Sequence, residues 1–427
     1  MNRDKGSDGG AGRGPGGGAG VNLPALRSHN AALVLDLLRT AGEGGVSRLE
    51  LAERTGLTPQ AVSKITARLR AEGLAAEAGR RASTGGKPAT VLRLVPSAAY
   101  AIGLHLDRDE LTAVLLDLAG ERVAERRAPL DLGAGAEAVL AVAGAAVAAL
   151  LGAEGGYLGE GGAVGAGRGH AAAPGRAPVA GRLPEAGAGA GAGGVSEPEG
   201  EGSRPTRLPL LGVGVAMPGP LDHRSGRPGR VTGFPEWDGF PLREELARWL
   251  GWPVALDKDT NAAALGLALR PGAPGSFAYV HLGTGLGAGL VLGGAVLRGG
   301  RTGAGELGHQ TVQLDGPACD CGGRGCLEVL CLAALARGDL PEAARVLGTG
   351  AANLVRLLDI DRVLLGGRAV LAAPAVFAHG TRELLTALGL PATVEIATGT
   401  TTVADGAAQL ILAPVFGKQD TTGTKIR

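Results

Sequence analysis

Aromatic side chains and long apolar runs are both scarce in this sequence of 427 residues. Phe, Trp and Tyr make up only 3% of it, so Leu, Val and Ala must fill its cores within an apolar fraction of 45%. The sequence has no apolar run of about 18 residues and no basic, apolar leader at its start. We therefore expect a cytoplasmic protein without a membrane partner. The length favours two or three domains over one core.

Cysteine is also rare, and all four cysteines lie within a span of thirteen positions. Such clustering indicates a metal site rather than the disulfide framework of a secreted protein. Three thiolates and one imidazole complete a tetrahedral zinc shell, so we predict a structural Zn²⁺ bound by His309, Cys319, Cys321 and Cys326. Buried thiols without a metal are the alternative. Cys331 falls outside the spacing and is expected to act as a small buried hydrophobe.

Composition separates ordered from unordered stretches of the chain. Residues 1–21 and 417–427 are predicted to be tails, and the Gly-, Ala- and Pro-rich segment 152–206 is predicted to be a disordered insertion. The ordered remainder predicts two domains, one at 22–95 and one formed by 96–151 together with 207–416.

Three short helices are expected in the N-terminal domain, the first at about 28–41. Ser47 can cap the second helix while Glu50 reaches back to it, which is the pattern of a capping box. Thr58 can cap the third helix, with Pro59 at the first helical position, where its missing N–H costs nothing. Two short helices, a glycine turn and a third helix are typical of a helix-turn-helix.

The third helix has a predicted buried stripe of Val62, Ile65 and Leu69 and a polar outer face, and a β-hairpin wing with a basic tip follows it. Residues 22–95 hold eleven basic and six acidic side chains, an excess suited to phosphate contacts. A helical dimerisation module is the alternative, which the basic wing disfavours. The side chains expected to contact double-stranded DNA are Thr58, Gln60, Ser63, Lys64, Arg68, Arg80, Arg81 and Lys87.

Several motifs resemble those of the ROK family (repressors, open reading frames and kinases). They are STGGKP at 83–88, GVAMPGPLD at 214–222, LGTGLGAGL at 282–290, the cysteine segment at 305–328 and VLLGG at 363–367. The resemblance implies a two-lobed α/β actin-like ATPase (ribonuclease H-like) fold behind the winged helix. Repressors of the family carry the added winged helix, whereas most of its kinases do not.

The resemblance also implies a sugar site. Asp259 matches the general base of the kinases, and its place at a helix N-terminus suits an ionised carboxylate. Glu306 and His309 match a pair that binds sugar hydroxyls, with the other nitrogen of His309 on zinc, and Glu328 matches a further sugar-binding carboxylate. The alternative for Glu306 and Glu328 is that they orient the zinc loop, and both roles can coexist.

Two departures from the kinase pattern stand out. Lys258 stands where the kinases usually have Asn. An asparagine side chain both donates and accepts hydrogen bonds, whereas a lysine ammonium only donates them. We therefore expect Lys258 to bind the sugar, but with a different ligand or a different geometry from the kinases. The phosphate loop of the kinases, Asp-x-Gly-Gly-Thr-Lys, corresponds here to HLDRDEL at 105–111, which lacks glycine and holds three carboxylates that would repel a polyanion. The remaining nucleotide-loop residues, expected to bind nucleotide or merely to pack, are Gly283, Thr284, Gly285, Gly287, Gly366 and Gly367.

These features favour a sugar-responsive repressor over an enzyme, with Asp259 as a vestigial base. We expect a homodimer, or a tetramer, whose winged helices bind an operator and whose cleft binds a sugar effector. One alternative is an ATP-dependent sugar kinase with an appended DNA-binding domain. A third hypothesis is a sugar-binding scaffold that does not bind DNA.

Overall fold

A computed structural model describes residues 29–81, 89–155, 208–399 and 402–418. Apart from residues 151–208, they belong to one compact unit. The predicted tail at 1–21, and most of the predicted segments 152–206 and 417–427, lie outside the described residues. Helix α4 (Ala136–Gly155) runs four residues past residue 151, where the first part of the ROK-like domain was predicted to end.

The N-terminal domain is a winged helix in which local capping sets the helix starts. The hydroxyl of Ser47 accepts from the backbone N–H of Glu50 at 3.2 Å, and Glu50 accepts from the N–H of Ser47 at 2.7 Å, which confirms the capping box. Thr58 caps the third helix by accepting from the N–H of Ala61 at 3.3 Å. The elements are α1 (His29–Ala41), β1 (Val46–Ser47), α2 (Arg48–Thr55), α3 (Pro59–Ala71), β2 (Ala75–Arg81) and β3 (Ala89–Leu94), with the sheet order β1-β3-β2.

The buried face of α3 differs from the predicted stripe at one position. Val62 and Leu69 are fully buried as expected, but Thr66 is buried as deeply, while Ile65 is half-buried. The hydroxyl of Thr66 donates to the carbonyl of Val62 at 2.9 Å. Because this bond satisfies its only polar group, a threonine can replace the expected apolar residue in the core.

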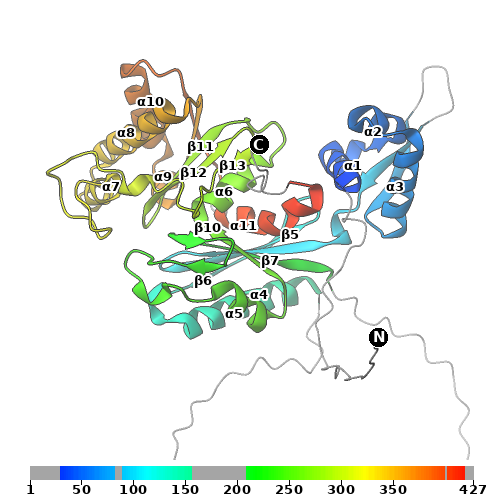
Figure 1. Ribbon diagram of the computed structural model, residues 1–427, viewed down its shortest axis with the longest axis horizontal. Coiled ribbons are helices and arrows are strands. Elements are labelled where there is room, and N and C mark those ends of the chain that lie inside the picture. The colour runs from blue at the N-terminus through cyan, green and yellow to red at the C-terminus, as the bar shows by residue number, and fades with distance from the viewer. Residues whose placement is uncertain (1–28, 82–88, 156–207, 400–401, 419–427) are drawn as a thin grey trace, which may run out of the picture. The chain divides into compact units, whose positions relative to one another are not determined.

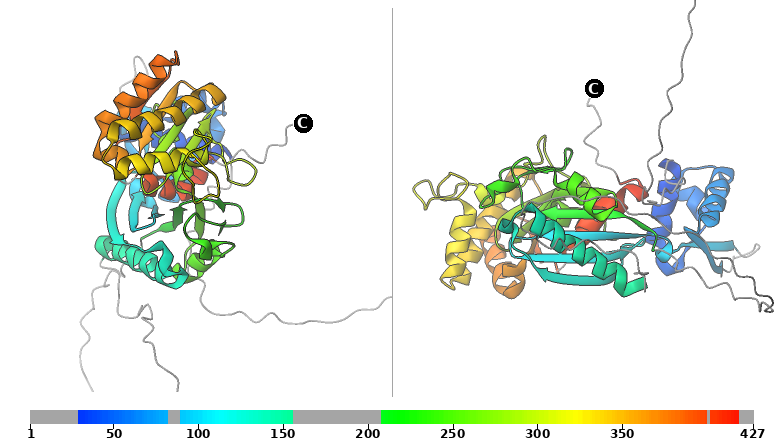
Figure 2. Two further views of the ribbon diagram at one scale, coloured as in Figure 1. Left: turned by 90° about the vertical axis from the view of Figure 1, so that its left-hand side faces the viewer. Right: turned by 90° about the horizontal axis from the view of Figure 1, so that it is seen from below.

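The first lobe of the C-terminal domain is built on a five-stranded sheet of order β10-β7-β4-β5-β6. Helix α11 (Thr402–Leu412) lies on one face, and α4 and α5 (Leu242–Leu250) lie on the other (Figures 1 and 2). A Cβ at Gly103 or Gly214 would collide with carbonyl oxygens of α11, so glycine lets the helix rest directly on the sheet. The strands are β4 (Tyr100–Leu106), β5 (Glu110–Asp117), β6 (Arg122–Pro129), β7 (Leu210–Met217) and β10 (Val254–Lys258), and the small hairpin of β8 (Leu221–Asp222) and β9 (Arg227–Pro228) follows β7.

The second lobe has its own five-stranded sheet, of order β13-β12-β11-β14-β15. Helix α6 (Asp259–Ala268) packs on one side, and a layer of helices on the other side buries a core rich in Leu, Val and Ala. The strands are β11 (Phe277–Leu282), β12 (Leu286–Leu292), β13 (Ala295–Val296), β14 (Arg362–Gly366) and β15 (Thr393–Ile396), and the helices are α7 (Leu327–Ala336), α8 (Leu340–Leu358), α9 (Arg368–Ala372) and α10 (Pro374–Ala387).

Helices α6 and α11 pack against each other between the two sheets (Figure 2). A Cβ at Gly406 of α11 would collide with the backbone of Ala262 in α6, so only a glycine allows this close approach. The lobes confirm the predicted two-lobed α/β architecture. They also place the start of α6 at the end of β10, beside the turn that joins β11 and β12.

The winged helix shares a hydrophobic core with the first lobe. Val34, Leu35 and Leu38 of α1 belong to one buried cluster with Leu412 of α11 and Phe416, which follows it. The guanidinium of Arg39 lies over the Phe416 ring, 5.0 Å from its centroid. The winged helix is therefore anchored to the end of α11.

Candidate functional site

A cluster of one histidine and three cysteines lies in the loop before α7. One donor atom from each of His309, Cys319, Cys321 and Cys326 lies within 4.8 Å of the others. Nδ1 of His309 is 3.7 Å from Sγ of Cys319, and the Sγ atoms of Cys321 and Cys326 are also 3.7 Å apart. Burial and the neighbouring thiols raise the pKa of Cys326 to about 12, so a thiolate there requires a nearby cation. These residues form a possible Cys3His metal site.

Glycine shapes the loop around this cluster. Gly322 and Gly325 have φ angles of 91° and 57°, which side chains other than glycine rarely adopt. A Cβ at Gly325 would also collide with the carbonyl oxygen of Gln313. Cys331 lies outside the cluster, fully buried in α7 with its Sγ 3.7 Å from the carbonyl of Ala343, as its sequence position predicted.

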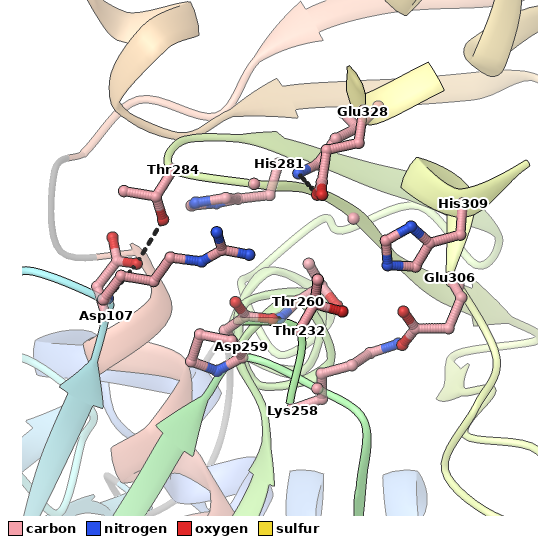
Figure 3. Close-up of a pocket in the computed structure, with 17 residues that line it drawn as sticks. Asp107, Thr232, Lys258, Asp259, Thr260, His281, Thr284, Glu306, His309 and Glu328 are labelled. Atoms are coloured by element: carbon pink, nitrogen blue, oxygen red, sulfur yellow. Dashed lines mark hydrogen bonds and ion pairs between the residues drawn. The ribbon is translucent and has the colours of Figure 1, made fainter. Parts of the chain in front are cut away.

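All five side chains predicted to bind a sugar line a single pocket (Figure 3). Lys258 ends β10 and Asp259 begins α6, so both lie where the first lobe meets the second. Glu306 and His309 flank a short 3-10 helix (Leu307–His309), and Glu328 is in the first turn of α7. Because His309 turns Nδ1 toward the cysteines, its other nitrogen is left for the pocket.

The carboxyl group of Asp259 is less acidic than its helix position suggested. Burial raises its pKa to about 7, and the carboxylates of Asp107 and Glu306 add to the rise. A 2.6 Å hydrogen bond from the N–H of Thr260 and the charge of Lys258 oppose the shift without cancelling it. Near neutral pH this carboxyl group is therefore only partly ionised, because desolvation outweighs the hydrogen bond at the helix N-terminus and the charge of Lys258.

The two glutamates of the pocket have different partners. Glu306 accepts from the ammonium of Lys258 at 2.9 Å, and Glu328 accepts from the backbone N–H of Leu286 at 2.7 Å. Within the described chain, neither carboxylate bonds to a side chain of the Cys3His cluster. Each therefore retains an oxygen that can accept from a ligand hydroxyl.

The predicted DNA-contacting residues of α3 share an exposed surface. Thr58, Gln60, Ser63, Lys64 and Arg68 are all exposed, although Arg68 also pairs with Glu72 at 3.1 Å. The wing is described only in part: strand β2 reaches the backbone of Arg80 and Arg81, and Lys87 lies outside the described residues.

Comparison with known proteins identifies both domains. Residues 34–75 match the model of a winged helix-turn-helix DNA-binding domain, and residues 206–337 match that of the ROK family. The chain is a winged-helix protein with a ROK family domain. A putative xylose repressor of Caldicellulosiruptor sp. (strain Rt8B.4) is 25% identical over 391 residues, or 82% of this chain and 85% of the relative. The glucokinase of Thermotoga maritima is 41% identical, but over only 30% of this chain and 42% of its own.

Solved structures agree with this fold. The crystal structure of a ROK family transcriptional regulator, a homologue of the Escherichia coli MLC protein, superposes with a TM-score of 0.66 at 20% identity and covers 93% of this chain and 98% of its own. A ROK glucokinase from Streptomyces griseus, in complex with glucose and AMPPNP, gives a TM-score of 0.53 at 21% identity, with 73% and 98% covered. No helix in the described ranges has the length and apolar character needed to cross a membrane.

Contacts between the lobes cross the cleft at the β4–β5 turn, which corresponds in sequence to the predicted phosphate loop. Asp107, in the β4–β5 turn, accepts from the hydroxyl of Thr284 at 2.8 Å. Arg368, at the start of α9, lies 2.6 Å from Asp109 and 3.6 Å from Asp107. The acidic turn of the first lobe is therefore paired with a cation of the second lobe.

The nucleotide-loop glycines of the ROK domain also have packing roles. A Cβ at Gly366 would lie 2.6 Å from the hydroxyl of Tyr279, and one at Gly367 would collide with the backbone of Leu282. A Cβ at Gly285 would lie 2.9 Å from Oε2 of Glu328. Gly283 and Gly287 have similarly close neighbours, with Cβ contacts of 3.0 and 3.1 Å. Backbone packing thus requires glycine at Gly367, whereas the close neighbours of the other four are side chains.

Sequence reasoning missed three polar residues of the cleft. His281 is half-buried, its Nδ1 lies 2.9 Å from the hydroxyl of Tyr279, and desolvation lowers its pKa to about 4. Desolvation likewise lowers the pKa of His105. Arg368 directly follows Gly366 and Gly367, and a basic residue beside two motif glycines was the available signal.

Proposed function

We propose that this chain is a sugar-responsive transcriptional repressor that does not phosphorylate its effector. The observation that supports this most directly is the union, in one compact unit, of a carboxylate-lined pocket and a winged helix with an exposed polar α3. Relatives named as xylose repressors and NagC, a DNA-binding transcriptional dual regulator of Escherichia coli, support the same function.

In this proposal the pocket binds a polyhydroxylated ligand through several acceptors. Asp259, Glu306 and Glu328 accept from sugar hydroxyls, and the free nitrogen of His309 forms a further bond. The Cys3His donor set fits Zn²⁺, which would hold His309 and the loop before α7 in place. The ion is then structural, because the four protein donors leave no open position for a reacting ligand.

The contacts of the β4–β5 turn, which corresponds to the phosphate loop of the kinases, support the absence of catalysis. Asp107 and Asp109 are paired with Thr284 and Arg368 of the opposite lobe. A nucleotide would have to break these contacts and face the carboxylates with its own negative charge. We infer that the loop is degenerate as a phosphate site and that Asp259 no longer serves as a base in phosphoryl transfer.

A route for the signal follows the packing of α6 on α11. The pocket residue Asp259 begins α6, α6 rests on α11, and the short 3-10 helix after α11 (Ala413–Phe416) packs on α1. Lys418, just beyond it, pairs with Asp36 of α1 at 3.1 Å. A sugar that binds one lobe arrangement more tightly than another would thereby change the orientation of the winged helix.

DNA binding is proposed to use two copies of the chain. In a homodimer, each α3 would enter the major groove, with half-sites roughly 34–36 Å apart or a multiple of that. Lys64 and Arg68 supply phosphate or base contacts from the exposed face.

Gel retardation on a palindromic fragment from the adjacent promoter tests this function. The wild type should retard the fragment, and a sugar effector should change the affinity. Lys64→Ala should weaken binding and lower the salt dependence by about one phosphate contact, whereas Arg356→Ala, at an exposed site on α8, should do neither. If no specific complex forms at low salt, the chain is a sugar-binding scaffold instead.

The competing function is an ATP-dependent sugar kinase, favoured by the retained Asp259 and by the glucokinase relative. A coupled assay of ADP release across hexoses, xylose and N-acetylhexosamines distinguishes the two. We expect no turnover above background, and sustained sugar-dependent ADP release would refute the non-catalytic proposal.

A further inference from the structure

Two ion pairs, the first of them buried, attach residues 298–306 to the end of β10. The guanidinium of Arg298 lies 2.6 Å from the carboxylate of Asp257, and these side chains are 3% and 1% exposed. The ammonium of Lys258, the next residue, lies 2.9 Å from Oε1 of Glu306, and these side chains are 4% and 37% exposed. Successive residues of one strand therefore hold both ends of this loop.

The loop is held between its ends as well. Lys258 also donates to the carbonyl of Ala304 at 2.6 Å. Thr302 is buried with a φ of 58°, and its hydroxyl lies 2.6 Å from Nδ1 of His223. A buried non-glycine residue in this conformation persists only where its surroundings fix it, so the loop is held in one arrangement.

Lys258 reaches Glu306 by lying flat against a glycine. A Cβ at Gly219 would lie 2.8 Å from Cδ of Lys258 and 3.2 Å from Oε1 of Glu306. Figure 3 shows the lysine extended toward the carboxylate of Glu306, with His309 beside it. Because the ammonium is almost fully enclosed and has two acceptors of the chain, a ligand has little access to it.

We propose that Lys258 is a positioning residue, which holds the carboxylate of Glu306 so that its second oxygen faces the sugar pocket. This inference rests on the proposed sugar-binding role of Glu306 and replaces the expectation that Lys258 itself binds the sugar. A carboxylate accepts hydrogen bonds only, so the ring position that meets Glu306 carries a donor, a hydroxyl or an N–H, rather than an ionised phosphate. Lys258 thus acts on specificity through Glu306.

A double-mutant cycle separates positioning from direct contact. Calorimetric titration with D-glucose, D-xylose and N-acetyl-D-glucosamine identifies a binding sugar, whose Kd is then measured for Lys258→Met, Glu306→Gln and the double variant. Each single change should weaken binding by about tenfold or more. The double variant should bind no more weakly than Glu306→Gln alone, because the lysine acts through that carboxylate. Losses that multiply would overturn the proposal, since they indicate independent contacts with the sugar.

Backbone hydrogen exchange of the ligand-free protein tests whether Lys258 holds residues 298–306 in place, and this test does not need a bound sugar. If no sugar binds in the titrations, that failure counts against the proposed function alone. Residues 298–306 should exchange faster in Lys258→Met than in the wild type, and Arg356→Met on α8 should leave them unchanged. If Lys258→Met does not fold, Gly219→Ala displaces the same side chain and should give the same acceleration. Unchanged exchange in the folded variant would overturn the proposal.

Discussion

Replacement of Asp259 by asparagine should stabilise the ligand-free protein, and more so at higher pH. The pKa of Asp259 is raised from its ordinary value of 3.8 to about 7. Since the folded state holds the proton more tightly than the unfolded state, the contribution of this group to stability is fully present below about pH 4. It is lost as the pH rises toward 7. Asparagine keeps the bond from the N–H of Thr260 and has no charge to bury.

The size of the effect follows from the shift. A change from 3.8 to about 7 corresponds to roughly 4 kcal/mol at 1.36 kcal/mol per pKa unit. Asp259 is partly exposed at the pocket, and solvent screening reduces this value, so we expect on the order of 2 kcal/mol between pH 4 and pH 7. For a chain of this size that corresponds to a rise of about 2–3 °C in Tm.

Thermal unfolding of Asp259→Asn and the wild type at pH 4, 5, 6, 7 and 8 measures this difference. Asp361→Asn is the matched control, because Asp361 is exposed in the turn before β14. The Tm advantage of Asp259→Asn should grow from pH 4 to pH 7 and then level off, while the control should follow the wild type. An advantage independent of pH would refute the reasoning, because it would show that Asp259 is not held protonated by burial.

Three further changes test other parts of the structure. Cys319→Ser should reduce bound zinc well below one ion per chain by metal analysis and lower Tm, whereas zinc absent from the wild type would contradict the metal assignment. Phe416→Ala should destabilise the shared core by about 3 kcal/mol or more and weaken operator binding, while Leu357→Ala, at a position 74% exposed, should do neither in thermal and gel-retardation assays. Arg368→Ala should change Tm by about 1 °C or less, because the ion-pair partner of Arg368, Asp109, is 59% exposed. If the same variant gains ATP binding by calorimetry, the ion pair of the wild type blocks the binding of phosphate.

Local sequence signals predicted the winged helix well, because they act over three or four residues. The hydroxyls of Ser47 and Thr58 meet backbone N–H groups three positions ahead, so the spacing alone locates the helix starts. The Cys-x-Cys-x4-Cys spacing likewise predicted a cluster whose donors converge. Thr66 could not be predicted to be buried, because apolar periodicity does not register a hydroxyl that bonds to its own helix.

The partners of the site residues could not be read from the sequence. Lys258 and Glu306 are 48 positions apart, and Arg368 and Asp109 are 259 apart. Resemblance to the ROK family placed Lys258 beside the sugar, but only the folded chain shows its ammonium on Glu306 and Ala304. The raised pKa of Asp259 could not be predicted either, because its helix position is a local signal, whereas burial and the charges of Asp107 and Glu306 depend on the folded chain.

The helices that link the pocket to the DNA-binding domain meet through glycines rather than through aromatic side chains, which are scarce in this chain. Helices α6 and α11 meet at Gly266 and Gly406, where a Cβ on the first would lie 2.9 Å from Cα of the second. Backbones in such contact have no flexible side chain between them to absorb a displacement, and a close-packed interior transmits strain. A movement of α6 at Asp259 must then shift α11 or separate the two helices. Since α11 continues into the segment that packs on α1, the first outcome reorients the winged helix.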